Sequence, residues 1–106
     1  MSLRAPLRVP VELKRGIRWF RLARTVSVAG LTLDAALPDQ ADGPLQVSFH
    51  LPGLPEPVTC LGEVIEEIVG EGETERAERR GVRFVDLDQT GAARIQAYVQ
   101  ERLGVD

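Results

Sequence analysis

The chain has 106 residues, of which 43% are hydrophobic and 27% are charged. This length accommodates one domain and excludes two domains with separate cores, and the apolar content predicts a folded chain rather than a disordered one. A single cysteine, Cys60, excludes an internal disulfide and any zinc site built from several thiolates. With no signal-peptide core and no apolar run of about 20 residues, the sequence predicts a soluble domain in a reducing cytoplasm.

The net charge of −3 hides an uneven distribution along the chain. Residues 1–24 hold seven cations and one acid, a net charge of +6, whereas residues 25–106 hold six cations and fifteen acids, a net charge of −9. The first segment is therefore a candidate site for anions. Nonspecific nucleic-acid binding is a less favoured function for this basic segment than binding of a small anionic ligand. The pI of the chain is about 5.2, and Trp19 and Phe20 are the only aromatic residues interleaved with the cations.

The first half of the chain predicts three strands. Alternating apolar and polar residues indicate a strand over residues 9–13, followed by a turn over 14–16. A long strand is predicted over residues 17–27, with its odd-numbered and even-numbered side chains on opposite faces. Gly30 interrupts this pattern, and an isolated glycine there indicates a bulge, a bend or a close approach of the backbone. A short strand follows over residues 31–33.

The second half predicts three more strands. Turn-forming residues over 38–44 and 52–57 delimit strands over residues 45–51 and 58–69. Residues 70–80 contain four glutamates and three arginines but no large apolar side chain, which predicts an exposed hairpin tip or a disordered loop. The last strand is predicted over residues 81–85.

Residues 88–104 have the apolar spacing of a helix, with Asp88 as the predicted N-cap and Gly104 as the predicted end. The apolar face of this helix comprises Ala92, Ile95, Val99 and Leu103. Six strands and one helix predict a mainly β domain, either a small barrel or a sandwich over residues 9–87, closed by the C-terminal α-helix over 88–104. Residues 1–8 precede the barrel as a mobile basic tail.

The sequence offers little for catalysis. The only histidine, His50, lies on the polar face of the strand over residues 45–51, and Cys60 has no cation or histidine beside it in the sequence to lower its pKa. The chain also lacks a phosphate-binding glycine loop. We therefore expect no catalytic residue, no metal site and no cofactor.

Two arginines, Arg4 and Arg8, stand four residues apart in a proline-stiffened stretch just before the first strand. Each guanidinium is a planar fork that can bind a phosphate or a guanine edge bidentately. Together the two arginines suit a nucleotide that carries both groups, although solvated charges are the simpler explanation for the pair taken alone.

A second sequence element, residues 25–30, favours a nucleotide site over solvated charges. Residues 25–30 (TVSVAG) place Thr25, Ser27 and Gly30 at the end of the second strand. PilZ domains carry R-x-x-x-R just before their first strand and [D/N]-x-S-x-x-G at the second, and this chain resembles both elements. The likeness extends to residues 8–11 and to the last strand, residues 81–87. The resemblance implies a small six-stranded antiparallel β-barrel over residues 9–87 with a C-terminal α-helix over 88–104, which receives the nucleotide cyclic di-GMP.

Carried over to this chain, the family's ligand contacts fall on Arg4 and Arg8 for guanines and phosphates, on the Ser27 hydroxyl, and on Gly30 for a close approach. Thr25 is the departure, because the family has Asp or Asn there. The resemblance implies a non-catalytic bacterial signalling module that binds cyclic di-GMP and relays it to a protein partner, without membrane or nucleic acid as partners. The alternative is a degenerate PilZ-like adaptor that does not bind cyclic di-GMP and acts through protein contacts.

Overall fold

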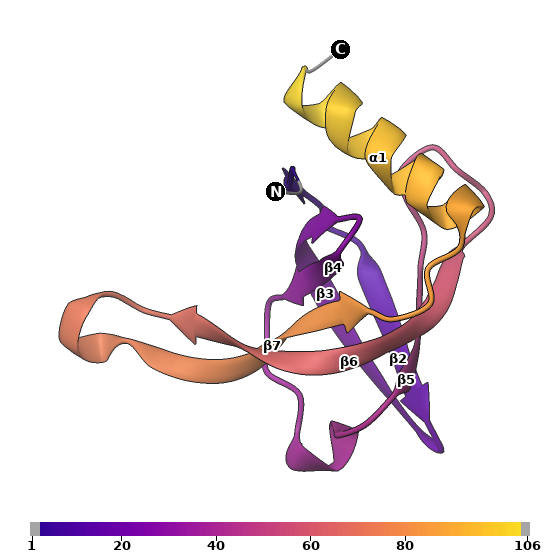
Figure 1. Cartoon of the computed structure of the whole chain (residues 1–106). Coiled ribbons are helices and arrows are strands. Elements are labelled where there is room, and N and C mark those ends of the chain that lie inside the picture. Colours follow the sequence, from indigo (N-terminus) through magenta and orange to yellow (C-terminus); the bar gives the residue numbers. More distant parts are fainter. Residues whose placement is uncertain (1–2, 105–106) are drawn as a thin grey trace.

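The computed structural model describes residues 3–104, so residues 1–2 of the predicted tail and residues 105–106 lie outside the described range. Within this range the chain forms seven strands, one long helix and two short 3-10 helices (Figure 1). The strands are β1 (Ala5–Pro6), β2 (Pro10–Arg15), β3 (Ile17–Ser27), β4 (Gly30–Leu33), β5 (Leu45–Phe49), β6 (Val58–Val69) and β7 (Arg76–Phe84). The helix is α1 (Gln89–Leu103), and the 3-10 helices are η1 (Asp39–Ala41) and η2 (Gly72–Thr74).

The strands form one antiparallel sheet in the order β1-β3-β2-β5-β6-β7-β4, and a further pairing of β4 with β3 closes six of them into a barrel. This confirms the predicted fold class, with β1 as an extra strand beside β3. The barrel interior is filled by aliphatic side chains and one phenylalanine, as the scarcity of aromatic residues requires. Its largest fully buried members on the strands are Val11, Leu13, Val26, Leu31, Leu33, Leu45, Val47, Phe49 and Val82.

Strand β3 changes face partway along its length. Ala23 and Thr25 pair with neighbouring residues of β4, so Arg24 between them has no partner on that strand. This bulge shifts the alternation of side chains by one residue, and Ala23 and Val26 are consequently both buried. The prediction that odd-numbered and even-numbered side chains keep to opposite faces is therefore wrong beyond Ala23.

The hairpin of β6 and β7 is longer than predicted and projects from the barrel (Figure 1). Residues 76–80, predicted to lie in an exposed tip or a disordered loop, belong to β7 and continue its pairing with β6 as far as Val69 and Arg76. Ion pairs from Glu78 to Arg76 and Arg80, at 2.6 and 3.0 Å, lie along this strand. Cross-strand pairing thus orders a segment that has no large apolar side chain.

Both predicted ends of the helix are confirmed. The Asp88 carboxylate accepts a hydrogen bond of 2.6 Å from the Gly91 N–H at the N-terminus of α1. Gly104 follows the last turn with φ of +70°, in the left-handed region that glycine adopts without steric cost. Over residues 3–104 no helix has the length and hydropathy needed to cross a bilayer.

Residues 5–7 of the predicted tail are part of the packed domain. Ala5 and Pro6 pair with β3, and the side chains of Ala5 and Leu7 are no more than 1% exposed. The Tyr98 hydroxyl on α1 donates a hydrogen bond of 2.7 Å to the Pro6 carbonyl. The structure therefore differs from the predicted boundary at residue 9, because tertiary pairing holds this stretch against β3 and α1. The mobility of the tail stays a prediction.

Candidate ligand-binding site

Four of the five predicted contact residues lie together where β1 meets the end of β3. The antiparallel pairing of Ala5 with Val26 sets Arg4 beside the last residues of β3. The Arg4 Nη1 donates to the Thr25 hydroxyl at 2.9 Å, and its Nη2 donates to the Ser27 hydroxyl at 3.4 Å. One guanidinium thus joins both hydroxyl groups of the second predicted element.

The Thr25 hydroxyl has a further partner on the neighbouring strand. Its Oγ1 lies 2.8 Å from the Oγ1 of Thr32 on β4, and both side chains are half-buried. A hydroxyl can accept from Arg4 and still donate once, so the pair forms a chain of hydrogen bonds from Arg4 through Thr25 to Thr32. Thr32 was not among the contact residues predicted from the sequence. Its polar position between two apolar residues of β4 was a signal, but only the cross-strand register identifies its partner.

Ser27 and Gly30 shape the turn between β3 and β4. The Ser27 side chain is 1% exposed, and its Oγ accepts a hydrogen bond of 3.1 Å from the Ala29 N–H inside the turn. A Cβ atom added at Gly30 would lie 2.0 Å from the Val82 carbonyl oxygen on β7. The predicted close approach of the backbone at Gly30 is therefore confirmed. Contact of either residue with a ligand stays a prediction.

Arg8 lies near this network but outside it. The backbone on either side of Arg8 is bonded to the bulge of β3, since the Leu7 N–H donates to the Arg24 carbonyl and the Ala23 N–H donates to the Val9 carbonyl, both at 2.9 Å. The side chains of Arg8 and Arg24 are exposed. Arg24 is thus a second cation beside the site. It was not predicted from the sequence, because its position next to Arg8 depends on the bulge in β3.

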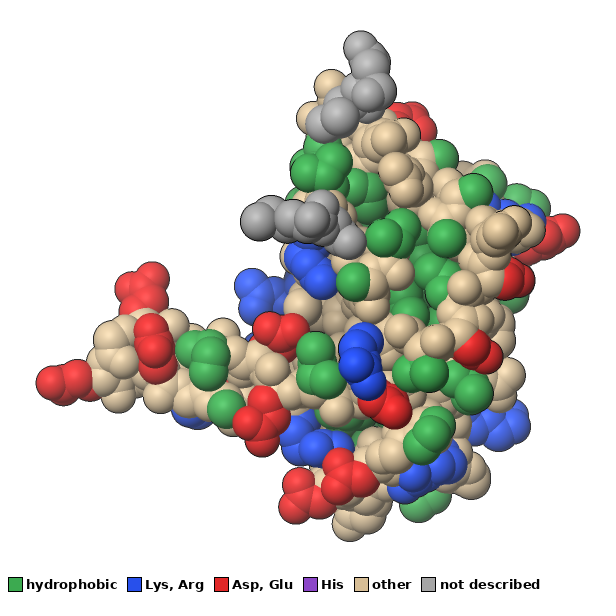
Figure 2. Space-filling view, in the orientation of Figure 1, with side chains coloured by type: hydrophobic (Ala, Val, Ile, Leu, Met, Phe, Trp, Pro, Cys, Tyr) green, Lys and Arg blue, Asp and Glu red, His purple; other side chains and the backbone are tan. Residues whose placement is uncertain are grey.

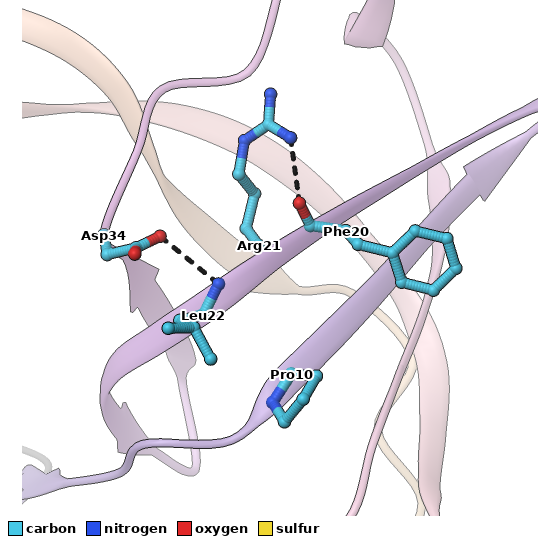
Figure 3. A pocket seen from close by; sticks show the side chains of 5 residues that line it. All are labelled: Pro10, Phe20, Arg21, Leu22 and Asp34. Carbon is cyan, nitrogen blue, oxygen red and sulfur yellow. Dashed lines mark hydrogen bonds between the residues drawn. The ribbon is translucent and has the colours of Figure 1, made fainter.

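A separate hollow of about 380 Å³ lies on the outside of β2 and β3, lined by Pro10, Phe20, Arg21, Leu22 and Asp34 (Figure 3). Its polar groups already have partners within the chain. Asp34 accepts from the Leu22 N–H at 3.2 Å, and Arg21 donates to the Phe20 carbonyl at 2.9 Å. Phe20 is 58% exposed and Leu22 is 40% exposed. The hollow therefore presents apolar surface rather than groups that would recognise a nucleotide.

Cys60 is 6% exposed, and its pKa is raised to about 11 by burial and, to a smaller extent, by the negative charges of Asp86 and Asp88. The thiolate therefore forms only as the pH rises toward that value, which agrees with the inert thiol expected from the sequence. At pH 8 we expect iodoacetamide to modify the folded chain on the order of 100-fold more slowly than the chain unfolded in urea. Equal rates in the two states would contradict this prediction.

His50 is the remaining side chain that was considered for chemistry from the sequence. His50 is exposed, as predicted. Among residues 3–104 no group of three or more His, Cys, Asp and Glu side chains could hold a metal ion.

The chain was compared with known proteins. The family model described as PilZ domain matches residues 2–101. The chain is similar to the Bacillus subtilis inhibitor of motility MotI/DgrA, with a TM-score of 0.68 and 16% identity, over 98% of this chain and 51% of that one. It is also similar to the PilZ domain of Escherichia coli YcgR with c-di-GMP, with a TM-score of 0.66 and 16% identity, over 97% of this chain and 90% of that one. A search of curated protein sequences found no significant match.

The chain therefore spans about half the length of MotI/DgrA. At 16% identity these two structures establish the barrel with its helix. The family model covers nearly the whole chain, including the segments that contain Arg4, Arg8, Thr25, Ser27 and Gly30. This chain belongs to the PilZ domain family.

Proposed function

We propose that this chain is a non-catalytic cytoplasmic receptor for cyclic di-GMP in bacterial signalling, which relays ligand binding to a protein partner. The observation that carries the proposal is the gathering of Arg4, Thr25, Ser27 and Gly30 at the end of β3, with Arg8 beside them. The bound nucleotide in the similar YcgR domain supports the choice of ligand.

Arg4 would exchange partners when the ligand binds. In the structure its guanidinium donates to two neutral hydroxyl groups. A phosphate carries a full negative charge and can accept two parallel hydrogen bonds from one guanidinium, which makes that pair stronger than the bonds from a guanidinium to neutral hydroxyl groups. A phosphate would therefore draw Arg4 away from Thr25 and Ser27, while the exposed Arg8 supplies the second cation.

The relay would pass through the N-terminal strand. Arg4 and Arg8 flank the β1 segment, whose Pro6 carbonyl accepts the hydrogen bond from Tyr98 on α1. Holding both arginine side chains on a nucleotide would order the surface around this packed strand and the adjoining face of the helix. A partner that binds this face better in the ordered state would respond to the ligand.

Isothermal titration calorimetry at fixed salt tests the proposal. We expect saturable heat with cyclic di-GMP, and at least about tenfold weaker binding by Arg8→Ala, because a hydrogen bond to a charged group contributes about 1.5–3 kcal/mol. Arg102→Ala, which removes an exposed arginine from α1, serves as the control and should bind as the unaltered chain does. No heat at ligand concentrations of about 1 mM, or unchanged binding by Arg8→Ala, would exclude a receptor of this kind.

A second candidate is an adaptor that no longer binds the nucleotide. The observation that favours it is the closed network at Thr25, whose single hydroxyl already contacts Arg4 and Thr32. Tight binding of cyclic di-GMP by the unaltered chain would remove this candidate. If the unaltered chain does not bind but Thr25→Asp does, the adaptor is supported.

A further inference from the structure

The projecting part of the β6–β7 hairpin, residues 66–78, is strongly acidic and is called the arm below. It carries six glutamates and one arginine, a net charge of −5. Figure 2 shows acidic side chains along this projection. The arm also exposes apolar surface, since Ile68 is 68% exposed. A two-stranded hairpin by itself is only marginally stable in water, so the arm is a segment that a contact would stabilise.

The outer surface of β2 and β3 has the opposite charge. We define the basic face as the exposed or half-buried charged residues of these two strands on the side away from the core, together with the apolar Phe20 and Leu22. The charged members are Lys14, Arg18, Arg24 and Glu12, a net charge of +2. Lys14 and Arg18 are directly paired across the two strands. Like charges in that position repel each other, so an anionic group placed over them would relieve the repulsion.

The two surfaces match in both charge and apolar character. The arm offers carboxylates around the exposed Ile68, and the basic face offers cations around Phe20, Leu22 and the hollow of about 380 Å³ beside them. We propose that the arm of one copy of this chain docks on the basic face of a second copy. The contact would bury apolar side chains at its centre and place opposite charges around them.

The arm cannot reach the basic face of its own molecule, because the two surfaces lie on different sides of the barrel, so a second copy of the chain supplies the matching surface. In Figure 1 the arm extends to the left of the barrel, whereas the turn between β2 and β3 lies at the lower right. Each copy has one arm and one basic face, so two copies related by a two-fold axis satisfy both contacts at once. This proposal does not depend on the ligand, since the arm contains none of the five predicted contact residues.

Analytical ultracentrifugation of the full chain tests the proposal through its dependence on salt. At about 0.01 M salt the Debye length is about 30 Å, and at about 1 M it is about 3 Å. We expect the mass at low salt to rise with protein concentration toward twice the 11.6 kDa of one chain. At high salt we expect association to weaken at least about tenfold, as screening removes the attraction between arm and face.

Two variants of equal net charge distinguish the effect of the charges in the arm from the effect of the net charge of the chain. Glu73→Lys with Glu75→Lys reverses charges in the arm and should abolish association at low salt. Glu56→Lys with Glu101→Lys makes the same change in charge at exposed positions outside the arm, and should leave association intact. Equal loss of association in both variants would assign the effect to net charge and would overturn the proposal.

Mixing complementary variants gives the sharpest result. Lys14→Glu with Arg18→Glu makes the basic face acidic, and this variant alone should be monomeric. In an equimolar mixture with the arm variant, the unaltered arm of the face variant meets the unaltered basic face of the arm variant, so heterodimers held by one of the two contacts should form, and their recovery would also show that both variants are folded. A wild-type mass of 11.6 kDa at low salt at all concentrations, or no recovery in the mixture, would overturn the proposal.

Discussion

Gly30→Ala is expected to lower the free energy of unfolding by about 3 kcal/mol. The added Cβ would lie 2.0 Å from the Val82 carbonyl oxygen, which belongs to the backbone of β7 and cannot rotate away. Relief of this overlap requires β4 and β7 to separate where Gly30 pairs with Arg83. Because these strands belong to the closed barrel, the cost falls on the whole domain.

Urea denaturation measures this effect. With a slope of about 1.5 kcal/mol per molar urea, the midpoint should fall by about 2 M. Gly91→Ala is the matched control, because its Cβ would meet the end of the flexible Leu87 side chain at 2.8 Å and alanine favours a helix. Its stability should stay within about 1 kcal/mol of the unaltered chain. Equal midpoints for both variants would show that the backbone of β7 moves away from the added Cβ at little cost, and would contradict the prediction.

Thr25→Asp is expected to strengthen the binding of cyclic di-GMP by about tenfold or more. The Thr25 hydroxyl is shared between Arg4 and Thr32 in the structure. A carboxylate has two oxygens, so once Arg4 has moved to a phosphate, both can accept from the amino and ring N–H groups of a guanine. One good contact to a base edge contributes about 1–3 kcal/mol, and about 1.4 kcal/mol corresponds to a factor of ten.

Calorimetry with Thr59→Asp provides the control for this variant. Thr59 is an exposed threonine on β6, and it too shares a hydrogen bond with another hydroxyl, that of Ser48 at 3.2 Å. The same change in charge is made there outside the site, so the affinity should not change. If Thr25→Asp bound no more tightly than the unaltered chain, position 25 would have no contact with the base.

The parts of the fold that local chemistry determines were predictable from the sequence. Asp88 and Gly104 mark the helix ends because capping involves only neighbouring residues. The strand over residues 17–27 was also predicted with its observed bounds. In contrast, β7 begins five residues earlier than predicted, at Arg76, because its first residues are ordered by pairing with β6.

The composition of the candidate site was less predictable than its location. Arg4, Thr25 and Ser27 were identified from the resemblance to the two PilZ motifs, and the structure joins them through hydrogen bonds. Thr32 and Arg24 were not identified, because their positions depend on the register of β3 with β4 and on the bulge within it. Register between strands is a property of the assembled sheet, and a one-residue shift moves every side chain to the other face.

The hydrogen bond from Tyr98 to Pro6 also affects how the domain is made in the cell. It joins residues 92 positions apart, and α1 contacts β1 and β3 along the same side of the barrel. Contacts between such distant residues slow folding, because a long loop must close first. At a synthesis rate of about 5–20 residues per second, Pro6 waits roughly 5–20 s on the ribosome before Tyr98 is added. The nascent barrel lacks its helix for that interval, so folding is completed only after α1 emerges.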